Sequence, residues 1–243
     1  MKTITFFHLR VLGLVTLTGS MAKATPGLAA PPCYGRLNDT ARFEEVCFTV
    51  LKNGTGGLSL REYRGASALA TLVEYEVGSA ATVNYQEALI NTTAAVIAYF
   101  AGEGNELNAS LLAARTVPFV LRPPTPTHNF WTSHLALAPS QFPPGGSPSP
   151  PDPVVGGVSL TPLGVQGVAV TLAVQRKVQA PLFPEPSDFY ALCAKLEAGI
   201  ETQLPGWAVD EASPYTPAHA RFWTEEFFSG PWTLECWMGV KKV

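Results

Sequence analysis

Residues 47–63 read CFTVLKNGTGGLSLREY and indicate the fold class of the chain around them. This stretch holds two runs rich in β-forming residues, 47–51 and 58–63, and the Asn53-Gly54 pair that ends the first run is typical of a hairpin turn. In the second run apolar and polar residues alternate, which is the pattern of a strand with one buried face. We therefore expect an antiparallel β-hairpin here.

The sequence beyond the hairpin predicts two helices among short strands. Residues 85–100 place apolar side chains at helical spacing after Asn84, a good N-cap residue. Residues 188–201 show the same period, with Ser187 as the expected cap. Further strands are expected near residues 68–75, 116–121, 130–137, 158–160, 167–174, 219–223 and 233–240. Two helices among many strands, in the same order in both halves of the chain, predict an α+β fold.

The composition favours a globular domain with many turns. The 243 residues include 22 prolines and 21 glycines, and seven prolines fall within residues 139–153, which we expect to form a surface loop. Charged residues make up 14% of the chain, and the net charge is -3 with no basic stripe. This charge distribution excludes a nucleic-acid partner.

The first 24 residues have the pattern of a secretory signal peptide. A basic start extends to Arg10, residues 11–17 are largely apolar, and small residues end at Ala24. The apolar run is shorter than the roughly 20 residues that a membrane-spanning helix needs. We therefore expect removal of residues 1–24, no membrane span, and a single secreted domain of residues 25–243.

The asparagines point to the same compartment. Four of them open the Asn-x-Ser/Thr pattern of N-glycosylation, namely Asn38, Asn53, Asn91 and Asn108. The number of these sequons exceeds chance expectation. We therefore expect an extracellular glycoprotein.

The four cysteines, Cys33, Cys47, Cys193 and Cys236, allow two disulfides with three alternative pairings in an oxidising compartment. We favour a bond between Cys47 and Cys236, because the first and last strands would be neighbours in a barrel. The alternative for Cys193, on the apolar face of the second helix, is a free buried thiol. The cysteine spacing fits no zinc pattern, and no metal site is expected.

Several separated segments together resemble the SOUL/heme-binding protein family. They are residues 58–63 (LSLREY), 87–105, 115–119 (RTVPF), 137–153 and 230–238 (GPWTLECWM). The resemblance spans nearly the whole mature chain. It implies a distorted antiparallel β-barrel of two βαββ pseudo-repeats with two flanking helices.

The resemblance also implies a function, which is binding of heme or a related tetrapyrrole in a shallow apolar pocket beside the first helix. The residues that it assigns to this pocket are Arg61, Tyr63, Leu89, Thr93, Val96, Ile97 and Phe100. Heme is then a weakly held ligand that folding does not require. Its binding is expected to rest on apolar contact rather than on a strong iron ligand.

The chain departs from the family at two places that matter for heme. Glu62 stands where some members carry a histidine, and no basic residue occurs from residue 84 to residue 100 to meet the propionates. Asn91, in the same helix, opens a sequon. These departures favour an alternative function, a secreted interaction or signalling glycoprotein that keeps the fold, has lost heme and binds an extracellular protein.

The sequence offers little for catalysis. The glycines at residues 54–57 lack the strand, helix and lysine of a phosphate-binding loop, and His128, His134 and His219 show no metal-like spacing. Each of these histidines is expected to be structural. An enzyme is not expected, and a third hypothesis would use Glu62 or Glu87 as an acid in a cleft.

Overall fold

The computed structural model describes residues 33–34, 44–63, 71–79, 81–125, 128–143, 147–162, 170–180, 185–213, 215–222 and 232–243. The expected signal peptide and Asn38 lie outside these residues. Two α-helices are present in the described part of the chain, α1 (Tyr85–Ala101) and α2 (Pro186–Gln203), with a short 3-10 helix at Leu112–Ala114. Neither α-helix is long and apolar enough to cross a membrane.

The strands form one large sheet and one small sheet. They are β1 (Cys33–Tyr34), β2 (Glu44–Glu45), β3 (Thr49–Asn53), β4 (Leu58–Tyr63), β5 (Thr71–Val77), β6 (Thr116–Val117), β7 (Phe119–Arg122), β8 (Trp131–Ala136), β9 (Val158–Pro162), β10 (Val170–Ala180), β11 (Trp207–Val209), β12 (Ala218–Phe222) and β13 (Trp232–Lys242). The large sheet has the order β3-β4-β10-β13-β12-β7-β8-β5-β9, with β11 added beside β13. The small sheet has the order β1-β2-β6.

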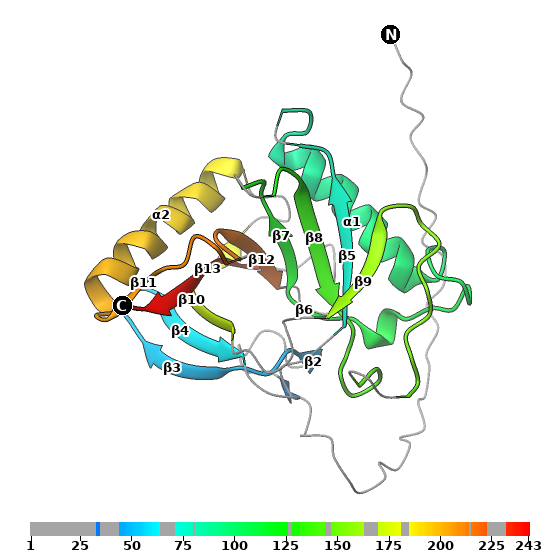
Figure 1. Ribbon diagram of the computed structural model, residues 1–243, viewed down its shortest axis with the longest axis horizontal. Helices are drawn as coiled ribbons and strands as arrows, with labels where there is room; N and C mark the ends of the chain where they lie inside the picture. Colours follow the sequence, from blue (N-terminus) through cyan, green and yellow to red (C-terminus); the bar gives the residue numbers. More distant parts are fainter. Residues whose placement is uncertain are drawn as a thin grey trace, which may run out of the picture.

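Two similar units make up the large sheet (Figure 1). The first unit runs β5-α1-β7-β8 and the second runs β10-α2-β12-β13, and the two join where β7 pairs with β12. In each unit, one edge of the sheet is extended by a strand that precedes the other unit in the sequence. The strand before β5, β4, pairs with β10 of the second unit, whereas β9, which precedes β10, pairs with β5 of the first.

The expected α+β class is confirmed, and the hairpin forms as β3 and β4. The closed barrel is wrong, because the described strands of the large sheet begin at β3 and end at β9, leaving it open. A barrel would need these two strands to pair, yet each pairs on one side only among the described residues. The reason is that the exchange of β4 and β9 extends the sheet outward at both ends.

Both helices pack on the same face of the large sheet. Trp131 of β8 contacts the ring of Tyr85 in α1 at 5.9 Å, and Cys236 of β13 is bonded to Cys193 in α2. The strand register from β8 through β7 and β12 to β13 places Trp131 and Cys236 on this same face. Tyr85 also stacks on Phe189 of α2, so the helices meet near their N-terminal ends. We call the opposite face, on which no described α-helix lies, the helix-free face.

The helix ends show where local sequence decides structure. Asn84 and Glu87 form a capping box at the start of α1, and Gly102 ends it with φ of 104°, a conformation that favours glycine. These features confirm the expected helix and its cap. The expected cap of α2 is wrong, because α2 begins two residues earlier than expected, at Pro186, and Ser187 lies inside its first turn. Proline suits that position because its missing N–H would have no partner there.

The cysteine pairing differs from the expected one. Cys193 and Cys236 form a disulfide with their Cα atoms 5.3 Å apart, so neither the Cys47–Cys236 bond nor a free Cys193 thiol occurs. Cys47 is disulfide-bonded as well, and the described residues hold no free cysteine. The expectation failed because Cys236 points to the helix face, where α2 packs on β13, whereas β3, which Cys47 precedes, is separated from β13 by β4 and β10.

Loss of the Cys193–Cys236 bond is expected to destabilise the fold. The bond closes a loop of 43 positions, so its removal in Cys193→Ala/Cys236→Ala should lower the free energy of unfolding by about 4 kcal/mol on the chain-entropy model. Urea unfolding measures the loss. Non-reducing peptide mapping is the control, and a peptide that links Cys236 to Cys47 would contradict the pairing.

Candidate ligand-binding face

A row of cross-strand partners runs over six strands on the helix-free face. In order from β5 to β10 the row consists of Glu74, His134, Val120, Ala220, Glu235 and Arg176. Its middle holds small apolar residues, and its two ends hold ionisable ones. The sheet thus places polar groups from both units on one face, with the small apolar residues Val120 and Ala220 between them.

A buried ion pair dominates one end of this face. The Arg61 guanidinium of β4 donates two hydrogen bonds of 2.8 Å to the two carboxylate oxygens of Glu235 in β13. Both residues are almost completely buried, at 3% and 0% exposure. Burial opposes the charge on Arg61, but the Glu235 carboxylate outweighs it and keeps the pKa of Arg61 above its ordinary value. Trp237 Nε1 donates a further hydrogen bond of 2.8 Å to Glu235.

A second ion pair lies in the other unit. Arg122 of β7 reaches Glu74 of β5 at 2.6 Å, across the intervening strand β8. The Arg61–Glu235 pair spans its middle strand, β10, in the same way. Burial raises the pKa of Glu74, although the nearby Arg122 acts against that shift. Each unit therefore carries an arginine–glutamate bridge over its middle strand.

Aromatic rings connect the two ends. Successive ring centroids lie 5.4 to 6.1 Å apart along a chain that we call the aromatic row, which consists of Phe48, Tyr63, Trp237, Tyr215 and His134. Arg61 lies over the Phe48 ring at 4.7 Å, a cation–π contact. All five side chains of the row are at most 8% exposed. The row is therefore a continuous buried aromatic cluster, in which neighbouring rings are tilted or edge-on to one another.

His134 occupies a special position in the row. Its ring meets Tyr215 edge-on, and its cross-strand neighbours are Glu74 and Val120. Burial, together with the nearby Arg122 charge, holds the pKa of His134 well below its ordinary value, so the imidazole is neutral. His134 Nδ1 is buried and has no hydrogen-bond partner among the described residues.

Other buried polar atoms on the helix-free face also lack a hydrogen-bond partner among the described residues. Within the described chain Ser59 Oγ, Arg61 Nε and Arg122 Nε are buried and make no hydrogen bond. Their register places Ser59 and Arg61 on the same face as Glu235. Because buried polar atoms in folded proteins nearly always have partners, a group of unpaired ones marks a place suited to a polar ligand atom or water.

The structure does not bring the residues of the expected heme pocket together. Leu89, Val96 and Phe100 are fully buried in the core, while Thr93 and Ile97 are half-buried. Helix α1 packs on β5 and β8, which leaves its apolar face against the sheet. Arg61 and Tyr63 lie on the helix-free face of β4, and four strands separate β4 from β8. Their use in one pocket stays a prediction that the geometry does not favour.

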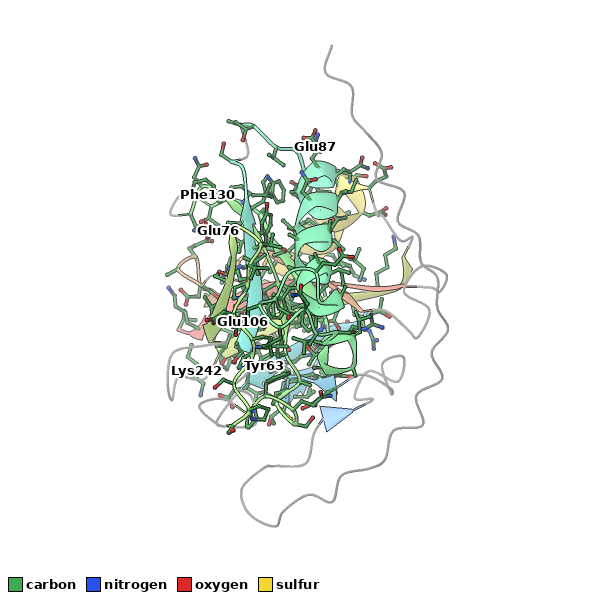
Figure 2. All side chains as sticks on the ribbon, turned by 90° about the vertical axis from the view of Figure 1, so that its right-hand side faces the viewer. Tyr63, Glu76, Glu87, Glu106, Phe130 and Lys242 are labelled. Atoms are coloured by element: carbon green, nitrogen blue, oxygen red, sulfur yellow. A yellow bond between two sulfur atoms is a disulfide. The ribbon has the colours of Figure 1, made fainter. Side chains whose placement is uncertain are left out.

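The residues of the catalytic hypothesis are also apart. Glu87 is part of the capping box of α1, and Glu62 lies on β4 facing the helix side. In Figure 2 Glu87 lies at one end of α1, whereas Glu76 and Phe130 lie on the other side of β5. Among the described residues no cluster of three His, Cys, Asp or Glu side chains could hold a metal ion.

Sequence reasoning missed most of the helix-free face. Phe48, Tyr215, Glu235 and Trp237 attracted no notice as site residues, and His134 was expected to be structural. The available signal was the alternation in β13, where Thr233, Glu235 and Trp237 share one face. A carboxylate flanked by buried strand residues predicts an ion pair, but its partner is 174 positions away.

Comparisons with known proteins give no family. No protein-family model and no curated protein matches the chain. Among solved structures, the EcmrR C-terminal domain aligns over 76% of this chain and 98% of its own, at 13% identity and a TM-score of 0.47. A hydrolase from Listeria innocua aligns over 78% and 94%, at 11% identity and 0.43. SAV2435 bound to tetraphenylphosphonium aligns over 75% and 93%, at 14% identity and 0.37.

We expect the Arg61–Glu235 pair to be costly to break. Glu235→Gln leaves a buried guanidinium without its counter-charge and should lower the free energy of unfolding by about 3 to 5 kcal/mol in urea titrations. Arg61→Met/Glu235→Leu removes both charges and should cost much less than the single change. Glu74→Gln is the control for a more exposed pair. An equal loss in the single and double variants would contradict the argument.

His134 predicts acid sensitivity of the fold. Because the pKa of His134 is depressed from 6.5, the unfolded chain binds more protons below that value, and stability falls as the pH drops. The slope from this residue is at most about 1.4 kcal/mol per pH unit. Urea midpoints at pH 7.5 and about 5.5 should therefore differ more in the wild type than in His134→Gln.

Glu74 should change the stability of the fold with pH in the direction opposite to His134. Since burial raises the pKa of Glu74 above its ordinary value, protonation on acidification relieves the cost of the buried charge, so this residue makes the fold more stable as the pH falls. Glu74→Gln should therefore not reduce the loss of stability between pH 7.5 and about 5.5, whereas His134→Gln should reduce it. Equal pH dependence in the wild type and His134→Gln would show that His134 is not the group responsible.

Proposed function

We propose that the protein is a secreted binding protein for a flat, largely apolar ligand of the tetrapyrrole kind, held on the helix-free face. The aromatic row is the observation that carries the proposal. It supplies adjoining aromatic rings across both units, tilted or edge-on to one another, and it ends at His134, a neutral imidazole whose Nδ1 has no partner among the described residues. A porphyrin needs these features, namely an aromatic surface and a group able to approach its iron.

The charged groups support the same ligand class. Arg61 and Arg122 each keep an unpaired Nε atom, and these cations suit the carboxylates that tetrapyrroles carry on their rim. The α1 surface is a poorer place, because its apolar side chains are already used in the core. The proposal therefore keeps the ligand that the family resemblance implies and moves its site.

The ligand must displace what now covers this face. Every ring of the aromatic row is at most 8% exposed, so binding requires a local opening before the rings are reached. Such an opening lowers affinity by the cost of the conformational change. Burying a few side chains at roughly 1.5 to 3 kcal/mol each, less the costs of association, leaves a micromolar dissociation constant as a reasonable expectation.

A second function, an interaction glycoprotein without a small ligand, is favoured by the same burial. The two ion pairs already satisfy much of the charge on the helix-free face, and the rings already pack on one another. In that case the face is a polar core, and a partner protein would bind elsewhere. The two functions differ in one measurable property, the response to hemin.

Hemin titration of the purified full-length secreted protein should produce a saturable Soret band. His134→Gln should weaken binding at least about tenfold, the effect of losing roughly 1.4 kcal/mol, and should shift the band. Ile97→Ala, on the half-buried part of α1, is the matched control and should change neither. Thermal unfolding confirms that both variants fold.

Two results would overturn the proposal. Loss of binding in Ile97→Ala with normal binding in His134→Gln would return the ligand to α1. No Soret change in the wild type would favour the interaction protein without a small ligand.

A further inference from the structure

The exposed apolar side chains of this protein gather around its sequons. Among the described residues nine large apolar side chains are well exposed: Val50, Leu51, Ile90, Leu107, Leu112, Phe130, Val154, Tyr190 and Val243. The first five lie within four residues of a sequon asparagine. Single exposed apolar residues are normal on a protein surface, but this placement beside possible glycan attachment sites needs a reason.

The three sequon asparagines in the described chain are all exposed. Asn53 ends β3, Asn91 lies on the outer side of α1, and Asn108 lies in the turn that follows α1. Asn108 adopts φ of 48°, a left-handed conformation that asparagine tolerates better than most residues. All three side chains can therefore carry a glycan without disturbing the core.

At the first of these sites the glycan would stand at a sheet edge. All five residues of β3 are exposed, and among the described strands β3 pairs only with β4. An exposed edge strand can pair with another chain. Lys52, the charged residue of β3, donates to the Gln203 carbonyl at 2.6 Å, which ties its ammonium to the end of α2. Val50 and Leu51 remain exposed beside Asn53.

At the other two sites, on and after α1, exposed apolar side chains again lie next to the sequon asparagine. Ile90 immediately precedes Asn91 on the outer surface of the helix. Leu107 precedes Asn108 and is the most exposed of this group, at 66%. Val154, remote in sequence, joins the same place because its N–H donates to the Gly104 carbonyl in the turn before Asn108.

We propose that N-linked glycans on Asn53, Asn91 and Asn108 cover these apolar side chains and prevent self-association through them. A glycan is bulky and strongly hydrated, so it shields the surface next to its attachment point. Uncovered apolar patches otherwise mark sites of association or aggregation. The inference rests on the secretory part of the proposed function and is independent of the ligand.

The test compares the full-length protein, secreted from cells that glycosylate, before and after enzymatic removal of its glycans. Mass spectrometry of glycopeptides measures the occupancy of each site. Size-exclusion chromatography with light scattering then follows the monomer, and an apolar dye reports exposed surface. We expect loss of most of the monomer peak and a severalfold rise in dye fluorescence after removal.

Two triple variants identify the responsible surface. Leu51→Thr/Ile90→Gln/Leu107→Gln, which creates no new sequon, should stay monomeric after its glycans are removed. The matched control, Phe130→Ser/Tyr190→Gln/Val243→Thr, changes exposed apolar residues away from the sequons and should associate like the wild type. Thermal unfolding verifies that both variants fold before their glycans are removed.

Results other than these would contradict either the secretory assignment or the shielding by glycans. Unoccupied sequons would overturn the shielding together with the secretory assignment. Occupied sites with a monomer that persists after glycan removal, or equal rescue by the control variant, would overturn the shielding alone. The hemin titration has no bearing on these readouts, so a failure of ligand binding is recognised separately.

Discussion

The ion pair between Arg61 and Glu235 is the constraint on which the arrangement of the large sheet depends. It joins β4 to β13 over β10, between residues 174 positions apart, with two hydrogen bonds in a nearly water-free setting. A buried charge costs several kcal/mol unless its counter-charge is held in good geometry. The position of β4 relative to β13 is therefore fixed closely, since sliding by one residue would turn one partner to the opposite face.

The exchange of strands makes the two units interdependent. Because β4 completes the second unit and β9 completes the first, neither unit can finish its part of the sheet alone. Contacts of this kind are far apart in sequence, and chains that depend on them fold slowly because loops must close before the contacts contribute. The disulfide from α2 to β13 restricts that search within the second unit.

Local signals made α1 predictable from sequence, whereas long-range pairing hid the site. Asn84, Glu87 and Gly102 act within a few residues of one another, so α1 could be placed almost to its ends. The start of α2 was missed by two residues, because the helix begins with Pro186 and its N-cap, Glu185, makes no side-chain capping hydrogen bond. The Arg61–Glu235 bridge and the disulfide depend on which strands and helices become neighbours, and residue types in one segment do not encode that.

The two faces of the sheet differ in a way that bears on function. The helix face is filled by apolar side chains from α1 and α2, so its chemistry is that of a core. The helix-free face instead buries one ion pair, holds a second that is partly buried, and contains four buried polar atoms that lack partners within the described chain. Apolar residues of similar volume would often stabilise such a site as well or better. The proposed recognition of a ligand would give these groups a use that stability alone does not require.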